Sequence, residues 1–379
     1  MKTVLVTGAV GFIGRNLVSQ LKLTEGIEVV TFTRDDTPEV MVDLVKKADF
    51  IYHVAGVNRP ENESGFKTDN TDLTTKIVGT LKEANLKTPL LITSSTQAVL
   101  DNPYGKSKQG AEQAVFDWHK ESGAPVFVYR LPGIFGKWAR PNYNSVVATF
   151  SHNIANDLPV TVSDPAYVVT LAYIDDVVAN FISLLGDQKK DVDYASVQTI
   201  ERTFEISLGD LKDRIEAIHT IRTSLVVPNL KDILNKFLYA TYISYLAEDN
   251  FAYTLQQNSD QRGWLAEFVK SEYAGQIFIS KTKPGISRGD HWHHTKIEKF
   301  LVVSGKAEIT FRNKKDDATD IISYIVDGDE AKVLDIPVGY VHAIKNIGDT
   351  DLVTIFWANE LLDKEHPDTY YEKVTPEEA

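Results

Sequence analysis

The chain opens on Lys2-Thr-Val-Leu-Val-Thr-Gly8-Ala-Val-Gly11-Phe-Ile-Gly14, and this stretch decides the fold of its first part. Residues 2–7 are rich in β-branched side chains and predict a buried strand, and residues 15–22 predict a helix. Glycines between the two allow a tight turn, close approach of the backbone to a pyrophosphate, and close packing of helix on strand. We therefore predict a dinucleotide site at the N-terminus of this helix, contacted by Gly8, Gly11, Phe12, Ile13 and Gly14.

Strands and helices alternate after this loop. Residues 28–33, 48–53 and 89–95 predict further strands, and residues 73–84 predict a helix, which together indicate a doubly wound parallel sheet. Ala55 and Gly56 follow the third strand and are candidate cofactor contacts. Arg34 follows the second strand, where an NAD site usually carries an acid, and a cation there suits a 2′-phosphate. We therefore predict NADPH as the cofactor.

A set of hydroxyl, phenol and ammonium groups comes next. Tyr104 begins a predicted helix nine residues after Ser95, and Lys108 lies four residues further on, on the same helix face. Hydride transfer to a ketone needs a proton donor, and a nearby ammonium would lower the pKa of the phenol so that Tyr104 can serve. Lys108 could also hold the cofactor ribose. Either Ser95 or Thr96 would orient the carbonyl, and Ser95 is the preferred candidate.

Residues 1–246 resemble the extended short-chain dehydrogenase/reductase family. The resemblance depends on the glycine loop, on His53-Val-Ala-Gly56, on the hydroxyls and on the Tyr104–Lys108 pair, although the gap before Tyr104 is shorter than in most members. It implies a Rossmann fold and a nucleotide-sugar substrate. It also implies that a donor-rich loop lies over the substrate, with contacts from Lys137, Arg140 and Asn144.

The second part of the chain has a different character. Residues 200–247 predict helices without strands, and after them short β-type segments follow at close spacing. Those segments are residues 276–281, 298–303, 307–312, 320–326, 332–335 and 351–358. We therefore predict an all-β domain at 247–379 after a nucleotide-binding domain at 1–246.

A group of histidines marks this second domain. His291 and His293 are followed by Glu298 and later by His342, and three imidazoles with one carboxylate suit a borderline divalent metal. The spacings resemble both motifs of the cupin family, except that Ala331 replaces an expected glycine. The resemblance implies a small β-barrel, a double-stranded β-helix, that binds one metal through these four residues, and zinc is our expectation. The neighbouring His294 is either a base or a side chain pointing outward.

Composition limits the remaining choices. A net charge of −13 argues against nucleic acid as a partner, since no basic stripe is present. The chain has no cysteine, which excludes disulfides and thiolate ligands. No apolar run reaches the roughly 18 residues of a membrane span, and the N-terminus does not resemble a signal peptide. We expect a cytoplasmic protein without membrane contact.

The order of the two domains is itself informative. An extended reductase followed by a cupin resembles the bifunctional enzymes of capsular polysaccharide biosynthesis. That resemblance implies C3 epimerisation of a UDP-2-acetamido-2,6-dideoxy-4-keto-hexose by the cupin, then NADPH-dependent reduction of C4 towards UDP-N-acetyl-L-fucosamine, in a homodimer. Two alternatives stay open, namely a plain 4-ketoreductase with a structural cupin and a non-catalytic NADPH sensor. The metal is either catalytic or structural.

Overall fold

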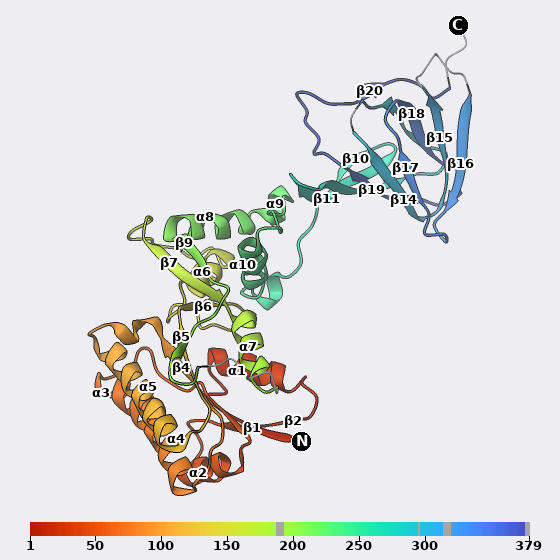
Figure 1. Cartoon of the computed structure of the whole chain (residues 1–379). Coiled ribbons are helices and arrows are strands. Elements are labelled where there is room, and N and C mark those ends of the chain that lie inside the picture. Colours follow the sequence, from red (N-terminus) through yellow and green to blue (C-terminus); the bar gives the residue numbers. More distant parts are fainter. Residues whose placement is uncertain (187–192, 295, 314–319, 376–379) are drawn as a thin grey trace. The chain divides into compact units, whose positions relative to one another are not determined.

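The computed structural model describes residues 1–186, 193–294, 296–313 and 320–375 (Figure 1). The chain forms two compact units. The first comprises Met1–Glu216 with Phe237–Ala247, and the second comprises Ala217–Lys236 with Glu248–Ala379. No helix among the described residues is long and apolar enough to cross a bilayer.

A parallel sheet of order β2-β1-β3-β4-β5-β8 forms the centre of the first unit. The chain passes from β1 to β2 on one side and then crosses to β3 on the other side of β1. This reversal places the ligand-binding switch point at the carboxyl ends of β1 and β3. The strands are β1 (Lys2–Thr7), β2 (Ile27–Phe32), β3 (Phe50–His53), β4 (Leu90–Ser95), β5 (Val126–Leu131) and β8 (Val197–Gln198).

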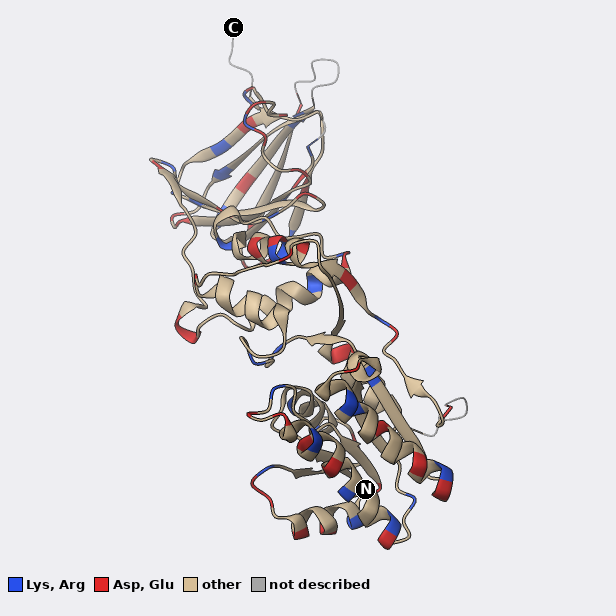
Figure 2. Cartoon of the chain, turned by 90° about the vertical axis from the view of Figure 1, so that its left-hand side faces the viewer, with Lys and Arg blue, Asp and Glu red and all other residues tan. Residues whose placement is uncertain are grey.

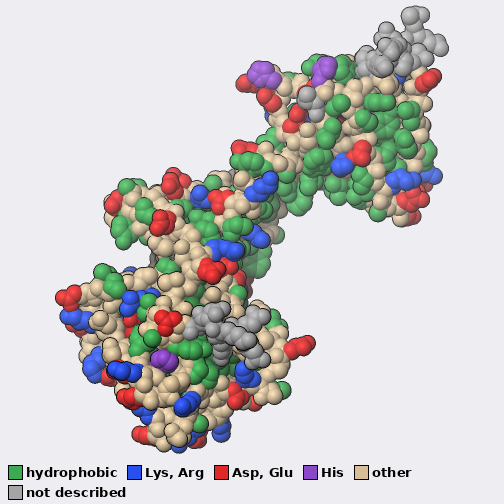
Figure 3. All heavy atoms as spheres, in the orientation of Figure 1, with side chains coloured by type: hydrophobic (Ala, Val, Ile, Leu, Met, Phe, Trp, Pro, Cys, Tyr) green, Lys and Arg blue, Asp and Glu red, His purple; other side chains and the backbone are tan. Residues whose placement is uncertain are grey.

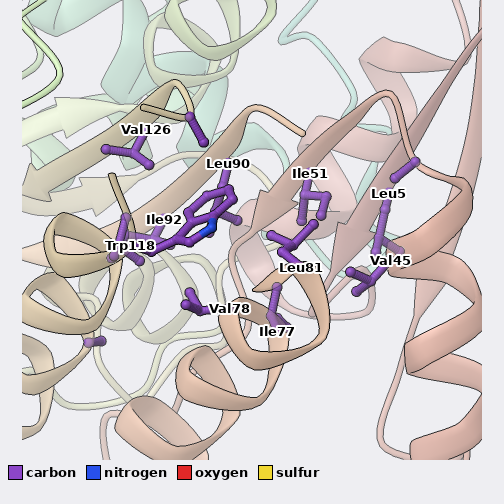
Figure 4. Packing of buried hydrophobic residues seen from close by; sticks show 14 of the residues in the cluster. Leu5, Val45, Ile51, Ile77, Val78, Leu81, Leu90, Ile92, Trp118 and Val126 are labelled. Carbon is purple, nitrogen blue, oxygen red and sulfur yellow. The ribbon is translucent and has the colours of Figure 1, made fainter. Parts of the chain in front are cut away.

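Helices cover both faces of this sheet. On one face α2 (Pro38–Lys47), α4 (Leu73–Glu83) and α5 (Pro103–Ser122) bury a continuous apolar cluster that includes Ile51 and Trp118 (Figure 4). Strand residues alternate in direction, so Tyr52 points to the other face, where its hydroxyl donates to the Phe181 carbonyl of α7 (Ile174–Ser183). Helix α1 (Phe12–Leu21) packs beside α7. Charged residues of both signs lie along the helices and loops (Figure 2).

A second, three-stranded sheet and several helices complete the region before residue 258. The prediction of helices alone over residues 200–247 is wrong at residues 204–207, which pair antiparallel with β7. This strand is too short for alternation to be visible in the sequence, and Phe204 packs edge-on against Phe135. The elements are α3 (Ser64–Phe66), the π-helix η1 (Lys67–Asp72), η2 (Thr96–Val99), β6 (Gly133–Phe135), α6 (Val146–Ala155), β7 (Val168–Tyr173), β9 (Phe204–Ser207), α8 (Leu208–His219), α9 (Ile221–Ser224), α10 (Ile233–Ile243) and η3 (Glu248–Asn250).

Two antiparallel sheets form the second unit, in the orders β10-β11-β12-β19-β14-β17 and β16-β15-β18-β13-β20. Their inner faces enclose an apolar cluster built on Phe300, Ile309, Phe311 and Phe356. The strands are β10 (Asn258–Asp260), β11 (Gly263–Ser271), β12 (Gly275–Thr282), β13 (Ser287–Trp292), β14 (Glu298–Ser304), β15 (Lys306–Asn313), β16 (Ile321–Asp327), β17 (Val333–Ile336), β18 (Tyr340–Asn346), β19 (Leu352–Ala358) and β20 (Tyr370–Tyr371).

All six predicted strand segments of this unit are strands in the structure. The strands β11, β13 and β18 were not among those segments. β13 is rich in polar residues, with a glycine and a histidine, which have low strand propensity, and its place in the sheet comes from pairing with β18 and β20. Tertiary pairing therefore outweighs local preference at β13, and β13 and β18 together carry two of the four conspicuous histidines, His291 and His342.

Candidate functional site

The glycine loop of the first unit lies at the sheet's switch point. Gly8 has φ +69°, and a Cβ there would lie 2.6 Å from the Ala55 Cα. A Cβ at Gly14 would lie 2.1 Å from the Gly8 carbonyl oxygen, so only glycine lets the helix begin this close to the loop. A Cβ at Gly11 would meet that same oxygen at 3.2 Å and nothing else within 4 Å in the described chain. The turn is thus open outward, as a pyrophosphate requires.

Arg34 stands at the carboxyl end of β2, next to this loop. The Gly8 amide donates to the Phe32 carbonyl, which ties the loop to that strand end. Asp36 folds back and accepts hydrogen bonds from the Thr33 amide and hydroxyl, at 2.7 and 2.9 Å. The Arg34 side chain is 80% exposed, with its guanidinium 3.9 Å from Asp69. The exposed Arg34 cation therefore stands beside the loop, while the Asp36 carboxylate is engaged by Thr33.

Ser95, Tyr104 and Lys108 converge where β4 meets α5. The buried Ser95 hydroxyl accepts a hydrogen bond from the Gln97 amide at 3.1 Å and lies close enough to Tyr104 to act on the pKa of the phenol, whereas Thr96 is exposed. Lys108 is buried and its Nζ donates to the Thr93 carbonyl at 3.0 Å, 6.0 Å from the centre of the Tyr104 ring. A Cβ at Gly56 would lie 3.1 Å from this Nζ, so the ammonium also faces the loop after β3.

Burial controls the protonation of this group. It raises the pKa of Tyr104, although the neighbouring Ser95 hydroxyl acts to lower it. Lys108 is not among the groups that shift this pKa in the structure, and its ammonium donates to the Thr93 carbonyl. Burial lowers the pKa of Lys108 to about 8, against the opposing charge of Glu112. Burial therefore favours the neutral form of both groups, although a pKa of about 8 leaves Lys108 mainly charged at neutral pH.

Several residues that support this group were missed from the sequence. Glu112 lies one helical turn after Lys108 and forms a bidentate pair with Arg130, at 2.9 and 2.6 Å. Asn70, on the π-helix η1, bonds both the backbone of Val57 and the Ser107 hydroxyl. The spacing of four from Lys108 could have indicated Glu112, but no sequence signal links Asn70 to its partners.

The predicted substrate loop contains residues in three different situations. The Lys137 ammonium is paired with Asp175 at 2.5 Å, so its charge is already matched. Arg140 is exposed, with its guanidinium 5.4 Å from the centre of the Tyr143 ring, and Asn144 is also exposed. Tyr143 acts on the pKa of Tyr104, which places this part of the loop near the phenol.

The four predicted metal ligands come together in the second unit. His291, His293, Glu298 and His342 each offer one ligand atom, and these atoms all lie within 4.8 Å of one another. The Glu298 carboxylate lies 3.4 Å from His293 Nε2 and 3.3 Å from His342 Nε2. Among the described residues, no group makes a hydrogen bond of good geometry with the buried His342 Nε2, although the Glu298 carboxylate is this close. An orphaned imidazole nitrogen in a compact set of three histidines and one carboxylate fits a divalent cation.

Protonation and hydrogen bonding prepare this set for a cation. Burial, with the neighbouring imidazoles, lowers the pKa of His291 to about 4, so the ring is in the neutral form that binds metal. Burial acts to raise the pKa of Glu298, but the His293 hydrogen bond and the nearby His342 ring lower it to about 2. His293 Nδ1 bonds the Asp368 carbonyl, which leaves its Nε2 for the metal side.

His294 lies apart from this set. Its ring is exposed and packs against Trp292 and Tyr370, at centroid distances of 4.5 and 5.0 Å. Of the two alternatives for His294, a base or a side chain pointing outward, the structure shows the side chain pointing outward.

Comparison with known proteins defines the class. The chain belongs to the NAD dependent epimerase/dehydratase family, whose model matches residues 4–198, and residues 258–370 match the Polysaccharide biosynthesis C-terminal domain. Over 97% of its length the chain is 42% identical to the UDP-2-acetamido-2,6-beta-L-arabino-hexul-4-ose reductase of Pseudomonas aeruginosa, 97% of which is covered. It is 28% identical over 124 residues, 30% of its length, to the probable low-salt glycan biosynthesis epimerase Agl13 of Haloferax volcanii, 80% of which is covered.

The structure is similar to that of the capsular polysaccharide assembling protein CapF of Staphylococcus aureus. The two share a TM-score of 0.90 and 42% identity, over 98% of this chain and 100% of that one. The predicted fold class, a Rossmann domain followed by an all-β cupin, is confirmed, and so is the predicted resemblance to two-domain capsular polysaccharide enzymes.

Proposed function

We propose that the chain is a bifunctional nucleotide-sugar enzyme. Its second unit inverts C3 of a UDP-2-acetamido-2,6-dideoxy-4-keto-hexose, and its first unit reduces the C4 ketone with NADPH, towards UDP-N-acetyl-L-fucosamine for capsular polysaccharide. The observation that carries this is the set of four ligand atoms within 4.8 Å in the same chain as Ser95, Tyr104 and Lys108, which converge where β4 meets α5. The names of the reductase and epimerase relatives support the two activities.

In the first unit the protein's own groups would bind and protonate the ketone. NADPH, when bound on the glycine loop, supplies the hydride to C4. The Ser95 hydroxyl donates to the carbonyl oxygen and orients it, and the Tyr104 phenol gives that oxygen its proton. Lys108, held by the Thr93 carbonyl, keeps a positive charge beside the phenol as its proton leaves. Arg34 supports NADPH over NADH through the 2′-phosphate.

In the second unit, proton exchange at C3 is the expected chemistry. The C3 proton is acidic because it is adjacent to the 4-keto group, and its removal requires stabilisation of the charge that develops on the ketone oxygen. A divalent cation, with zinc as our choice, would supply Lewis-acid polarisation of that oxygen. His291, His293, Glu298 and His342 would hold the cation, and the low pKa values of His291 and Glu298 keep both as ligands at neutral pH.

Isotope exchange tests the epimerase half. In D2O, with the 4-keto sugar and without NADPH, the protein should place deuterium at C3, as detected by NMR. Absence of exchange at C3 would contradict the proposed epimerase activity of the second unit and leave a plain 4-ketoreductase. Tyr104→Phe should abolish NADPH oxidation and leave the exchange intact, because the phenol lies in the other unit.

Metal content is a separate measurement. Elemental analysis should find about one divalent ion per chain, and His342→Ala should remove it. The control His366→Ala changes an exposed histidine outside the set and should keep the ion. Equal metal content in the two variants would contradict the assignment of the ligands.

We also propose a homodimer. Among the described residues β16 pairs only with β15 and forms the open edge of its sheet. Ile322, Tyr324 and Ile325 on this strand are 46%, 50% and 51% exposed, and hydrophobic side chains gather on the visible face of the unit (Figure 3). A second copy could cover this edge by antiparallel pairing about a twofold axis. Light scattering should give twice the chain mass for the wild type and the mass of a single chain for Tyr324→Lys.

A further inference from the structure

Polar atoms without partners are concentrated in the second unit. In the part of the chain that the structure describes, seven buried side-chain nitrogen or oxygen atoms lack a hydrogen-bond partner. Four of them are on strands β12, β13, β18 and β19: Ser280 Oγ, Arg288 Nη2, His342 Nε2 and Thr354 Oγ1. Burying such atoms unsatisfied is unfavourable, so their concentration on one set of strands points to a ligand. The metal set accounts for His342 but not for Arg288.

The register of β13 turns Arg288 inward. Arg288 lies opposite Ile344, a member of the apolar cluster between the sheets, and His291 lies opposite His342. Residues that are opposite each other on paired strands share a face. Three residues of regular strand would place Arg288 and His291 on different faces, but a β-bulge at Asp290, which has φ +57°, returns both to the inside. Arg288 is thus the inward neighbour of a metal ligand.

Among the described residues the Arg288 guanidinium has a hydrogen bond but no ion-pair partner of its own. Its Nε donates to Thr282 Oγ1 of β12, in the opposite sheet, at 2.9 Å. No described carboxylate forms an ion pair with it, and the nearby Asp260 is engaged by Arg262 at 2.9 and 2.5 Å. A partly buried cation that lacks an anion is unfavourable unless a ligand provides one.

We propose that Arg288 binds the diphosphate of the nucleotide sugar at the second unit, so that the sugar ring lies against the metal-ligand set. This inference rests on the proposed function and names the residue that orients the substrate there. The sugar ring of that substrate is neutral, so its diphosphate is the anion that a guanidinium fork would recognise with parallel donors.

The spacing and the surroundings suit this assignment. Successive inward positions on a strand lie about 7 Å apart, which is comparable with the span of a pyranose ring and its glycosidic oxygen. Arg262 and Asp260, which neutralise each other, lie at the same end, because Gly263 pairs with Thr282, the acceptor of the Arg288 hydrogen bond. Among the described residues, Arg288 is therefore the cation there that is left for an anion. The protein as a whole carries a charge of −13, so attraction of a diphosphate depends on such local cations.

Inhibition by UDP tests the inference at each unit separately. In Arg288→Gln, the inhibition constant of UDP against C3 deuterium exchange should rise about 10- to 100-fold, because the variant loses a charged pair of hydrogen bonds. Its inhibition constant against NADPH-dependent reduction should stay unchanged, since the reductase has its own substrate site. Metal content should remain that of the wild type, which shows that the neighbouring ligand set is intact.

A matched charge change and a binding measurement complete the test. Lys281→Gln removes the same charge from the outer face of β12, where Lys281 pairs with Asp351, and should leave both constants unchanged. Calorimetry with UDP should find two sites in the wild type and one in Arg288→Gln, whether or not the wild type catalyses exchange. If calorimetry finds these two stoichiometries but the wild type catalyses no exchange at C3, the proposed epimerase is rejected and the diphosphate site at Arg288 is kept. Equal UDP affinity and stoichiometry in wild type and variant would overturn the inference.

A second variant covers the case in which glutamine at this position prevents folding. Arg288→Lys keeps the charge and removes the fork, so it should give a smaller rise in the UDP inhibition constant against exchange. No rise in this variant, with Arg288→Gln unfolded, would also overturn the assignment.

Discussion

Glu112 offers the sharpest test of how the first unit is held together. It is 3% exposed, and its carboxylate accepts hydrogen bonds from Ser94 and, twice, from Arg130, at 2.5, 2.9 and 2.6 Å. Removing one partner of a buried ion pair leaves the other uncompensated and costs about 3–5 kcal/mol. Glu112→Gln keeps the size and one acceptor oxygen, so we expect the lower end of that range.

Urea unfolding followed by far-UV circular dichroism measures this loss, because most of the helices lie in the first unit. The matched control is Glu121→Gln on the same helix, whose partner is Lys82 and whose side chain is 61% exposed. An exposed pair contributes at most about 1 kcal/mol. If the two variants unfold at the same urea concentration, the buried pair does not stabilise the unit as argued. In addition, loss of the Glu112 charge should lower the pKa of Lys108 below its value of about 8 and shift the pH profile of reduction to lower pH.

Three further outcomes follow from the first unit. Gly14→Ala should abolish NADPH binding by calorimetry, since its Cβ would lie 2.1 Å from a backbone oxygen, whereas Gly79→Ala on α4 meets nothing within 4 Å and should be neutral or stabilising. Burial lowers the pKa of His53 to about 3, so the unfolded chain alone binds this proton below about pH 6.5. Stability should therefore fall by about 2 kcal/mol from pH 7 to pH 5, and the fall should be smaller in His53→Gln; an unchanged pH slope would refute this. Arg34→Ala should reduce the preference for NADPH over NADH about 10- to 100-fold, and an unchanged ratio of the two kcat/KM values would dismiss the 2′-phosphate assignment.

The sequence alone predicted those features whose physical cause is local in the chain. Turn chemistry and strand period identified the glycine loop, and residue type and spacing identified the Tyr104–Lys108 pair and the four metal-ligand candidates. The fold class followed from them, because a Gly-rich strand–helix turn and close-spaced short strands each suit few architectures.

Tertiary structure decided what depends on partners far away in the sequence. Whether Ser95 or Thr96 meets the phenol depends on which side of β4 the helix α5 packs, and the structure buries Ser95. Lys137 is matched by an aspartate 38 residues later, which makes it a weaker candidate for a phosphate than its loop position indicated. Arg288 faces the metal-ligand set only because a bulge at Asp290 shifts the register of β13 against β18. Burial, ion pairing and register are properties of the packed molecule, because each is determined by a neighbour that the local pattern does not contain.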